Sequence, residues 1–277
     1  MTLTGTAKAA VDRYEIDNAE RRSDAFVVGR KGHTGIVLLD RPEAGNSHTR
    51  AMILGLSELW IEWDDDPSIR TMVMGSTTDK FFCTGIDLKE ASQLGFGSPQ
   101  ARGSGRTHRD VPVLKPMITA VEGMAVGGGL HWVVESDIVI AGDKATFRDT
   151  HVEVGIVGGR ENLGFALKAG LGAALYISLI GKKAVIDANR AERLGVVQEV
   201  VPAGTALERA LELADGINDN SPAAMAKELE VLWAMAEMHY NDAVRYGWER
   251  VYSQQAHPDA KEGPRSFAEK RKPNWTV

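Results

Sequence analysis

The stretch that decides the fold is Phe81-Phe82-Cys83-Thr84-Gly85-Ile86-Asp87-Leu88, an apolar run that ends in a glycine turn and continues as a polar segment. An apolar run at residues 72–75 precedes it and predicts a β-strand that leads into the turn. A second glycine segment, Gly127-Gly128-Gly129-Leu130-His131, follows further along the chain. Each segment offers backbone amides beside glycine, where no side chain hinders a ligand. Two such amides aimed at one point make a socket for an oxygen that gains negative charge.

The second glycine segment lies between a predicted strand and a predicted helix. Residues 117–121 are an apolar, β-rich run, the glycines interrupt it, and residues 130–135 begin a helical pattern. We therefore expect the Gly128 amide at a helix N-terminus, where unpaired N–H groups and the helix dipole favour an anion. A single glycine cluster more often serves the close packing of a strand against a helix. Two clusters in this order favour the socket.

These motifs resemble those of the crotonase, or enoyl-CoA hydratase/isomerase, superfamily. The resemblance runs from Phe26 to Trp275 and includes LDRP (39–42), FFCTGIDLKE (81–90), KPMITAVEGMAVGGGLHW (115–132), SDIVIAGDKATF (136–147) and EGPRSFAEKRKPNW (262–275). It implies an α/β fold with a ββα spiral core and a C-terminal helical region that packs in a trimer. We expect an N-terminal arm at residues 1–24, the core with the active site at 25–204, and the C-terminal helical region at 205–277.

The resemblance also implies roles for residues of the two motifs. In the family, the oxyanion hole is built from the amide after the glycine of the first motif and the amide of the middle glycine of the second. Carried over to this chain, these are the amides of Ile86 and Gly128. The family places the turn that holds His48 near a bound acyl-CoA, and Asp87 directly follows Ile86. We expect His48 and Asp87 to bind substrate.

The C-terminal tail combines an aromatic residue with cations. Arg265, Lys270, Arg271 and Lys272 surround Phe267. Such a cluster is most often a solvated charged face, but an aromatic ring among cations can also stack on an adenine and hold its phosphates. In the resembled family, the matching Phe and Lys help to bind coenzyme A, often across a subunit boundary. Phe267 and Lys270 occupy those positions, which favours a CoA thioester substrate.

The composition of the chain restricts its function. With 277 residues and 43% hydrophobic content, it can bury a sizeable core. It lacks an uninterrupted apolar run of roughly eighteen residues and the apolar block of a signal peptide, so we expect a cytoplasmic protein without a membrane partner. The net charge of −6 argues against a nucleic-acid surface. The single cysteine, Cys83, excludes an intramolecular disulfide and cysteine-rich metal sites.

Cys83 lies just before Gly85, where a nucleophilic thiol is conceivable. We expect instead a small buried residue behind the oxyanion turn. No metal is expected, and no cofactor apart from coenzyme A as part of the substrate.

The residues at the catalytic positions depart from the family pattern. Typical enoyl-CoA hydratases carry glutamates at the positions that His131 and His151 occupy here. We expect His131 in the first turn of its helix, where the positive end of the dipole keeps the ring neutral and able to act as a base. His151 lies between Asp149 and Glu153 in sequence, and a nearby acid can orient it.

This pair of imidazoles resembles the β-diketone hydrolases, a branch of the superfamily that includes 6-oxocamphor hydrolase and cleaves carbon–carbon bonds. The local likeness includes ATFRD (145–149) and GIV (155–157). In that branch, an acid shortly after a glycine pair supports the second histidine. Here Gly158-Gly159 is followed by Arg160 and then by Glu161. Glu161 is a third catalytic candidate, although a solvent-facing place at a helix start is the commoner role for such a residue.

The sequence thus favours retro-Claisen hydrolysis of a β-dicarbonyl substrate, either a free diketone or a CoA thioester. Histidines would move protons while the two amides hold the enolate oxygen. The alternative is hydration or isomerisation of a 2-enoyl-CoA, with His131 or His151 in place of a carboxylate. A non-catalytic scaffold or RNA-binding protein would need a basic face and an eroded oxyanion motif, and the chain has neither.

Other segments have simpler patterns. Residues 25–39 predict two short strands and residues 49–63 a helix. Residues 94–109, rich in Gly, Ser and Arg, predict a mobile loop beside the first glycine motif. Residues 225–248 carry more apolar side chains than one buried stripe needs. We expect the C-terminal helices to bury surface between the subunits of a homotrimer or a dimer of trimers.

Overall fold

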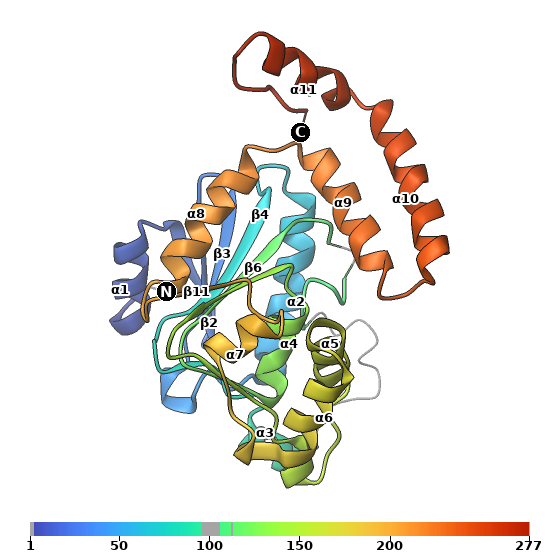
Figure 1. The fold of residues 1–277 in the computed structure, drawn as a ribbon. Helices are drawn as coiled ribbons and strands as arrows, with labels where there is room; N and C mark the ends of the chain where they lie inside the picture. Colours follow the sequence, from blue (N-terminus) through green and yellow to red (C-terminus); the bar gives the residue numbers. More distant parts are fainter. Residues whose placement is uncertain (1–2, 96–105, 112, 277) are drawn as a thin grey trace.

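The computed structural model describes residues 3–95, 106–111 and 113–276 (Figure 1). Within these ranges the chain alternates strands and helices in an α/β fold, as the sequence predicted. Most of the loop expected at 94–109 falls on residues 96–105 and lies outside the described residues.

A seven-stranded sheet forms the centre of the fold. In sheet order, its strands are β1 (Asp17–Ser23), β2 (Phe26–Lys31), β3 (Thr34–Leu39), β4 (Thr71–Ser76), β6 (Met117–Val121), β8 (Ile138–Gly142) and β11 (Glu199–Val201). The β1–β2 and β2–β3 pairs are antiparallel, and all pairs from β3 to β11 are parallel. Every residue of β3 is buried, as expected for a strand whose sheet is covered on both faces.

A smaller four-stranded sheet carries the glycine turns. In order, its strands are β10 (Ile186–Asp187), β9 (Thr146–Arg148), β7 (Met124–Val126) and β5 (Phe81–Cys83). The long strands β4, β6 and β8 each lead to a short strand of this sheet and then to helical structure, which is the ββα spiral implied by the resemblance. Because β5 pairs with β7, with Cys83 opposite Ala125, the turns that follow these two strands lie side by side.

Helices cover both faces of the large sheet. The helix α8 (Ala206–Asn218) packs on one face together with Ile36 and Leu38 of β3. Val37 and Leu39 point to the other face and pack in the same core as α2 (Arg50–Asp65). This division follows from the alternation of side chains along a strand.

Shorter helices surround the smaller sheet. They are α3 (Leu88–Leu94), α4 (His131–Val134), α5 (Arg160–Ala169), α6 (Leu171–Ile180) and α7 (Ala188–Arg193), with the 3₁₀ helices η1 (Pro42–Ala44), η2 (Gly127–Leu130), η3 (His151–Val154) and η4 (Gly181–Lys183). The helix α5 packs between α4 and α6. Among the described residues, no helix has both the length and the apolar character needed to cross a membrane.

Residues 3–24 are not an arm separate from the core. They form α1 (Gly5–Tyr14) and β1, and β1 pairs with β2 as the edge of the large sheet. Ala7 of α1 is buried, and Thr6 donates a hydrogen bond to Asp40 at 2.8 Å. The boundary expected after residue 24 therefore falls inside a hairpin of the sheet.

The last three helices extend away from the two sheets (Figure 1). They are α9 (Pro222–Ala234), α10 (Tyr240–Gln255) and α11 (Asp259–Ala268), and α10 packs against α9. Many large apolar side chains of this region are exposed, among them Leu232, Met235, Tyr240, Val244, Trp248 and Tyr252. Large exposed apolar patches are typical of contact surfaces. Subunit association through these helices stays a prediction.

Candidate active site

One cavity brings together most of the residues that the sequence marked as candidates. It has a volume of about 370 Å³. Its wall includes six of these candidates: His48, Ile86, Gly128, His131, His151 and Glu161. Arg106, Asp110, Ile156, Val157, Gly159 and Arg160 also line it.

The amides of Ile86 and Gly128 lie close together at this cavity. A Cβ atom on Gly128 would lie 3.4 Å from the amide nitrogen of Ile86, and a Cβ on Gly85 would lie 3.0 Å from that of Gly128. Gly85 also has a φ of +94°, which residues with a side chain rarely adopt. The close approach of the two turns therefore depends on glycine at both positions.

The local backbone leaves both amides without a partner in their own element. His48 and Ile86 form a parallel bridge in which His48 N donates to Gly85 O at 2.8 Å and Asp87 N donates to His48 O at 3.0 Å. In this pattern the N–H of Ile86 points away from the bridge. Gly128 lies in the first turn of η2, where an N–H has no acceptor inside the helix. Both amides are thus placed to bind a ligand oxygen.

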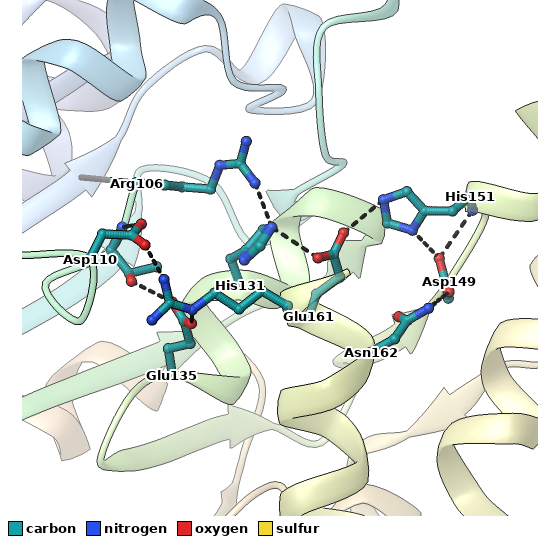
Figure 2. Close-up of polar contacts among 10 residues, drawn as sticks. Arg106, Asp110, His131, Glu135, Asp149, His151, Glu161 and Asn162 are labelled. Carbon is teal, nitrogen blue, oxygen red and sulfur yellow. Dashed lines mark hydrogen bonds and ion pairs between the residues drawn. The ribbon is translucent and has the colours of Figure 1, made fainter. Parts of the chain in front are cut away.

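Two imidazoles flank one carboxylate in the cavity wall (Figure 2). Oε1 of Glu161 lies 2.8 Å from Nε2 of His151, and Oε2 lies 3.1 Å from Nε2 of His131. On the far side of His151, Nδ1 lies 2.5 Å from Oδ1 of Asp149. Asn162 donates to the other oxygen of Asp149 at 2.8 Å. Asp149, His151, Glu161 and His131 therefore form one continuous chain of polar contacts.

Glu161 is buried. It does not have the solvent-facing place at a helix start that the sequence suggested as the commoner role for such a residue. Its exposed fraction is 5%, and it lies in the first turn of α5. Neighbouring residues on a helix point in different directions, so Arg160 pairs instead with Asp110 and Glu135. The sequence offered Glu161 as a candidate, and the packing of α5 against α4 brings its carboxylate to the imidazoles.

The two carboxylates keep His151 protonated. Burial opposes a charge on this ring, but the hydrogen bonds to Asp149 and Glu161 outweigh burial and raise the pKa of His151 to about 9. Burial likewise disfavours the ionised form of Glu161, but its contacts with His131 and His151 hold its pKa well below the ordinary value. At neutral pH, His151 is therefore an imidazolium between two carboxylates and a proton donor rather than a base.

One ring nitrogen of His131, Nε2, faces both a cation and an anion, Arg106 and Glu161. Nη1 of Arg106 lies 2.5 Å from Nε2 of His131, the atom that also faces Glu161 (Figure 2). A guanidinium only donates hydrogen bonds and a carboxylate only accepts them. An unprotonated Nε2 therefore accepts from Arg106, and a protonated one donates to Glu161. His131 can take up a proton with a partner ready for either state.

Sequence reasoning did not find Arg106. It follows a segment rich in Gly, Ser and Arg, and nothing in its local pattern distinguishes it from the other arginines there. Its carbonyl oxygen accepts a hydrogen bond from Nε1 of Trp132 at 2.9 Å, which fixes its backbone beside the helix that carries His131. This contact joins residues far apart in sequence and has no local signal.

Two residues of the first motif have structural roles. Cys83 is fully buried, and burial raises the pKa of its thiol to about 12, so the expectation of a buried residue is confirmed. Asp87 was predicted to bind substrate but lies outside the cavity lining. Its carboxylate caps α3 by accepting from Lys89 N at 3.0 Å and Glu90 N at 3.2 Å, and it pairs with Arg41 at 3.0 Å.

Phe267 and Lys270 lie away from the cavity of their own chain. The helix α11 lies at the opposite end of the molecule from α5 and α6 (Figure 1). Phe267 is 87% exposed. Arg271 pairs with Glu262 at 2.5 Å and with Glu269 at 2.7 Å, so acids neutralise part of the cationic cluster. The role of Phe267 and Lys270 in coenzyme A binding stays a prediction. In that role, the two residues would bind the coenzyme A of a substrate held in the cavity of a neighbouring subunit.

Comparisons with known proteins agree with this fold. A model of the enoyl-CoA hydratase/isomerase family matches residues 30–277. An enoyl-CoA hydratase of Mycobacterium tuberculosis is 35% identical over 256 residues, which cover 90% of this chain and 95% of that protein. A carnitinyl-CoA dehydratase of Proteus mirabilis is 32% identical over 262 residues, which cover 91% and 98%. The crystal structure of an enoyl-CoA hydratase/isomerase from Mycobacterium paratuberculosis has a TM-score of 0.83 at 34% identity, with 92% of this chain and 99% of that chain covered.

Proposed function

The chain belongs to the enoyl-CoA hydratase/isomerase family of the crotonase superfamily, and we propose that it adds water to the double bond of a 2-enoyl-CoA thioester through an enolate. The observation that carries this proposal is that Ile86 and Gly128 line the same cavity as His131 and His151. The names of the relatives, enoyl-CoA hydratase and carnitinyl-CoA dehydratase, support hydration or isomerisation more than the carbon–carbon hydrolysis that the sequence favoured.

In the proposed reaction, the carbonyl oxygen of a 2-enoyl thioester lies between the two amides. Water adds to the β-carbon, and the electron pair of the double bond moves to the carbonyl oxygen. The N–H groups of Ile86 and Gly128 stabilise the enolate that results. In comparable sites, each such donor lowers the activation free energy by about 3 kcal/mol. The oxyanion hole is thus the main source of catalysis.

The proton of the water passes to His131. Unlike His151, this ring is not held between two carboxylates, so its Nε2 can act as the base. Once protonated, it donates to Glu161, whose Oε2 lies 3.1 Å away. Glu161 thereby stabilises the charge that His131 acquires.

The proton that the α-carbon needs comes from His151. This residue is an imidazolium at neutral pH, and its Nε2 contacts Glu161, which provides a path toward the cavity. Loss of a proton by His151 and gain of one by His131 leave the total charge of the cluster unchanged. Addition of water across a double bond requires such a pair of one base and one acid.

Hydrolytic cleavage of a β-dicarbonyl substrate is the second candidate. One observation favours it: imidazoles, not carboxylates, occupy both positions flanking Glu161 in the cavity. His131 would activate water for attack on a ketone carbonyl, and the carbon–carbon bond would then break. The enolate of the leaving fragment would occupy the same oxyanion hole and take its proton from His151.

Heavy-oxygen water distinguishes the two reactions. The enzyme is incubated with crotonyl-CoA, a β-ketoacyl-CoA and a cyclic β-diketone, and the products are analysed by mass spectrometry. Hydration places one labelled hydroxyl on an intact acyl chain, whereas carbon–carbon hydrolysis places the label in a new carboxylate. A labelled hydroxyl from crotonyl-CoA alone supports the first proposal. Absence of label from every product of a folded enzyme contradicts both.

A further inference from the structure

His48 lies next to the oxyanion hole and takes no part in the proton transfers among His131, Glu161 and His151. Its backbone bridges to Ile86, and the residue lines the cavity although only 2% of it is exposed. The ring packs edge-on against Trp132, with 5.6 Å between ring centroids and an angle of 87°. The backbone bridge and this packing hold the imidazole in one place.

The Nε2 atom of His48 approaches the region where the two amides converge. It lies 2.5 Å from the position that a Cβ would take on Gly128, and the amide nitrogen of Ile86 lies 3.4 Å from the same position. Among the described residues, Nε2 has no hydrogen-bond partner. A buried polar atom without a partner is costly and rare. A ligand atom bound at the two amides would supply that partner.

His48 is neutral at physiological pH. Its burial, followed by the nearby charge of Arg106, holds its pKa well below the ordinary value. A neutral imidazole carries one N–H and one lone pair, and an oxygen placed at Nε2 selects the tautomer with the proton on that nitrogen. A neutral ring can therefore donate to a negative oxygen without becoming a strong acid.

We propose that the Nε2–H group of His48 is a third donor of the oxyanion hole and binds the enolate oxygen together with the amides of Ile86 and Gly128. This inference rests on the proposed enolate chemistry and extends it to a side chain. The donor gains strength as negative charge develops on the oxygen, so it acts on the transition state more than on substrate binding.

Three substitutions separate a donor from a base and from a packing group. His48→Gln places an amide N–H near the position of Nε2, His48→Asn carries the same amide on a side chain too short to reach, and His48→Leu fills the space without a donor. We expect kcat to fall about 100-fold in His48→Asn and His48→Leu, with KM changed less than about threefold, and less than about tenfold in His48→Gln. Circular dichroism and thermal unfolding identify the variants that retain the fold.

A second test measures the ionisation of a bound ligand at equilibrium, so it does not depend on the catalytic rate of any variant. Acetoacetyl-CoA ionises to an enolate that absorbs in the ultraviolet. Stopped-flow spectra measure how much of the bound acetoacetyl-CoA is ionised before the enzyme converts it to product. Binding to the parent and to His48→Gln should shift the ionisation to lower pH. In His48→Leu, the acid dissociation constant of the bound ligand should be about tenfold smaller than in the parent.

The outcomes divide clearly. Equal ionisation of the bound ligand in the parent and in folded His48→Leu contradicts the third donor. A loss of kcat in His48→Gln as large as in His48→Leu assigns His48 as a base and also contradicts it. Failure of the parent to bind acetoacetyl-CoA, by contrast, overturns the proposed CoA enolate function, and the inference with it.

Discussion

The carboxylate of Glu161 lies 2.8 Å from Nε2 of His151, and this contact makes a histidine into a cation between two acids. Asp149 and Glu161 are ionised and His151 is protonated at neutral pH, so the three groups together carry excess negative charge. Uptake of a proton by the adjacent His131 offsets this excess. The contact thus links the acid and the base of the proposed mechanism.

Substitution of Glu161 by glutamine keeps the size of the side chain and removes its charge. We expect kcat to fall about 100-fold because protonated His131 loses its partner, with KM nearly unchanged. Steady-state kinetics with the substrate found in the labelling experiment measure both constants. Glu153→Gln is the matched control, since Glu153 is exposed and accepts from Lys182 N at 3.0 Å outside the cavity. Equal rates in the two variants would remove Glu161 from the mechanism.

The protonation of His151 should make the protein less stable at alkaline pH. Its pKa is raised from 6.5 to about 9 in the folded state, so its contribution is complete below the unfolded value and is lost as pH rises through the folded value. The loss corresponds to roughly 3 kcal/mol of unfolding free energy. Urea unfolding of the parent and of His151→Gln at about pH 6 and about pH 9.5 measures it as a difference between proteins.

Comparing the two proteins cancels groups that titrate in the same range. Lys168 is one, because burial lowers its pKa to about 8 and makes its own contribution rise with pH. The free energy of unfolding of the parent should exceed that of His151→Gln by a clearly larger amount at about pH 6 than at about pH 9.5. A margin that stays constant with pH would show that His151 is not held as a cation.

A methyl group at Gly128 should disable the oxyanion hole. The Cβ of Gly128→Ala would lie 2.5 Å from Nε2 of His48 and 3.4 Å from the amide nitrogen of Ile86. We expect kcat to fall at least about 100-fold. Gly216→Ala in α8 is the control, because its Cβ meets nothing within 4 Å, and it should add about 0.5–1 kcal/mol of stability without changing kcat. Gly128→Ala with parental kcat would refute the site.

Removal of the tail contacts tests whether coenzyme A is used. With Phe267 and Lys270 both changed to alanine, KM for a thioester should rise at least about tenfold, which equals roughly 1.4 kcal/mol, while kcat stays constant. High salt should weaken thioester binding in the parent more than in the double variant. The control is Lys261→Ala, which removes an exposed cation from α11, the helix that carries Phe267. Unchanged KM in the double variant would leave the tail as an ordinary charged surface.

The parts of the site that depend on local backbone could be predicted from the sequence. The resemblance supplied the ββα spiral, and glycine marked the two turns because only glycine allows the φ of Gly85 and the close approach at Gly128. His131 and His151 follow these turns at positions that the spiral brings to one cavity.

Long-range packing decided the rest. The direction of Glu161 depends on how α5 lies against α4, and the place of Arg106 depends on a hydrogen bond from Trp132. Asp87 has the expected position in the motif, but its carboxylate accepts hydrogen bonds from the first turn of α3 and pairs with Arg41. Such contacts join segments that the sequence keeps far apart, so no local pattern reveals them.

The distance of α11 from the cavity has a consequence for mixed assemblies. On the proposed arrangement, each catalytic unit takes its cavity from one chain and Phe267 and Lys270 from another. Two defective proteins, one with Glu161→Gln and one with the double tail substitution, would then combine into some units that have both an intact cavity and an intact tail. At thioester concentrations below KM, co-assembled mixtures should exceed the summed activity of the separate proteins, which is complementation between subunits.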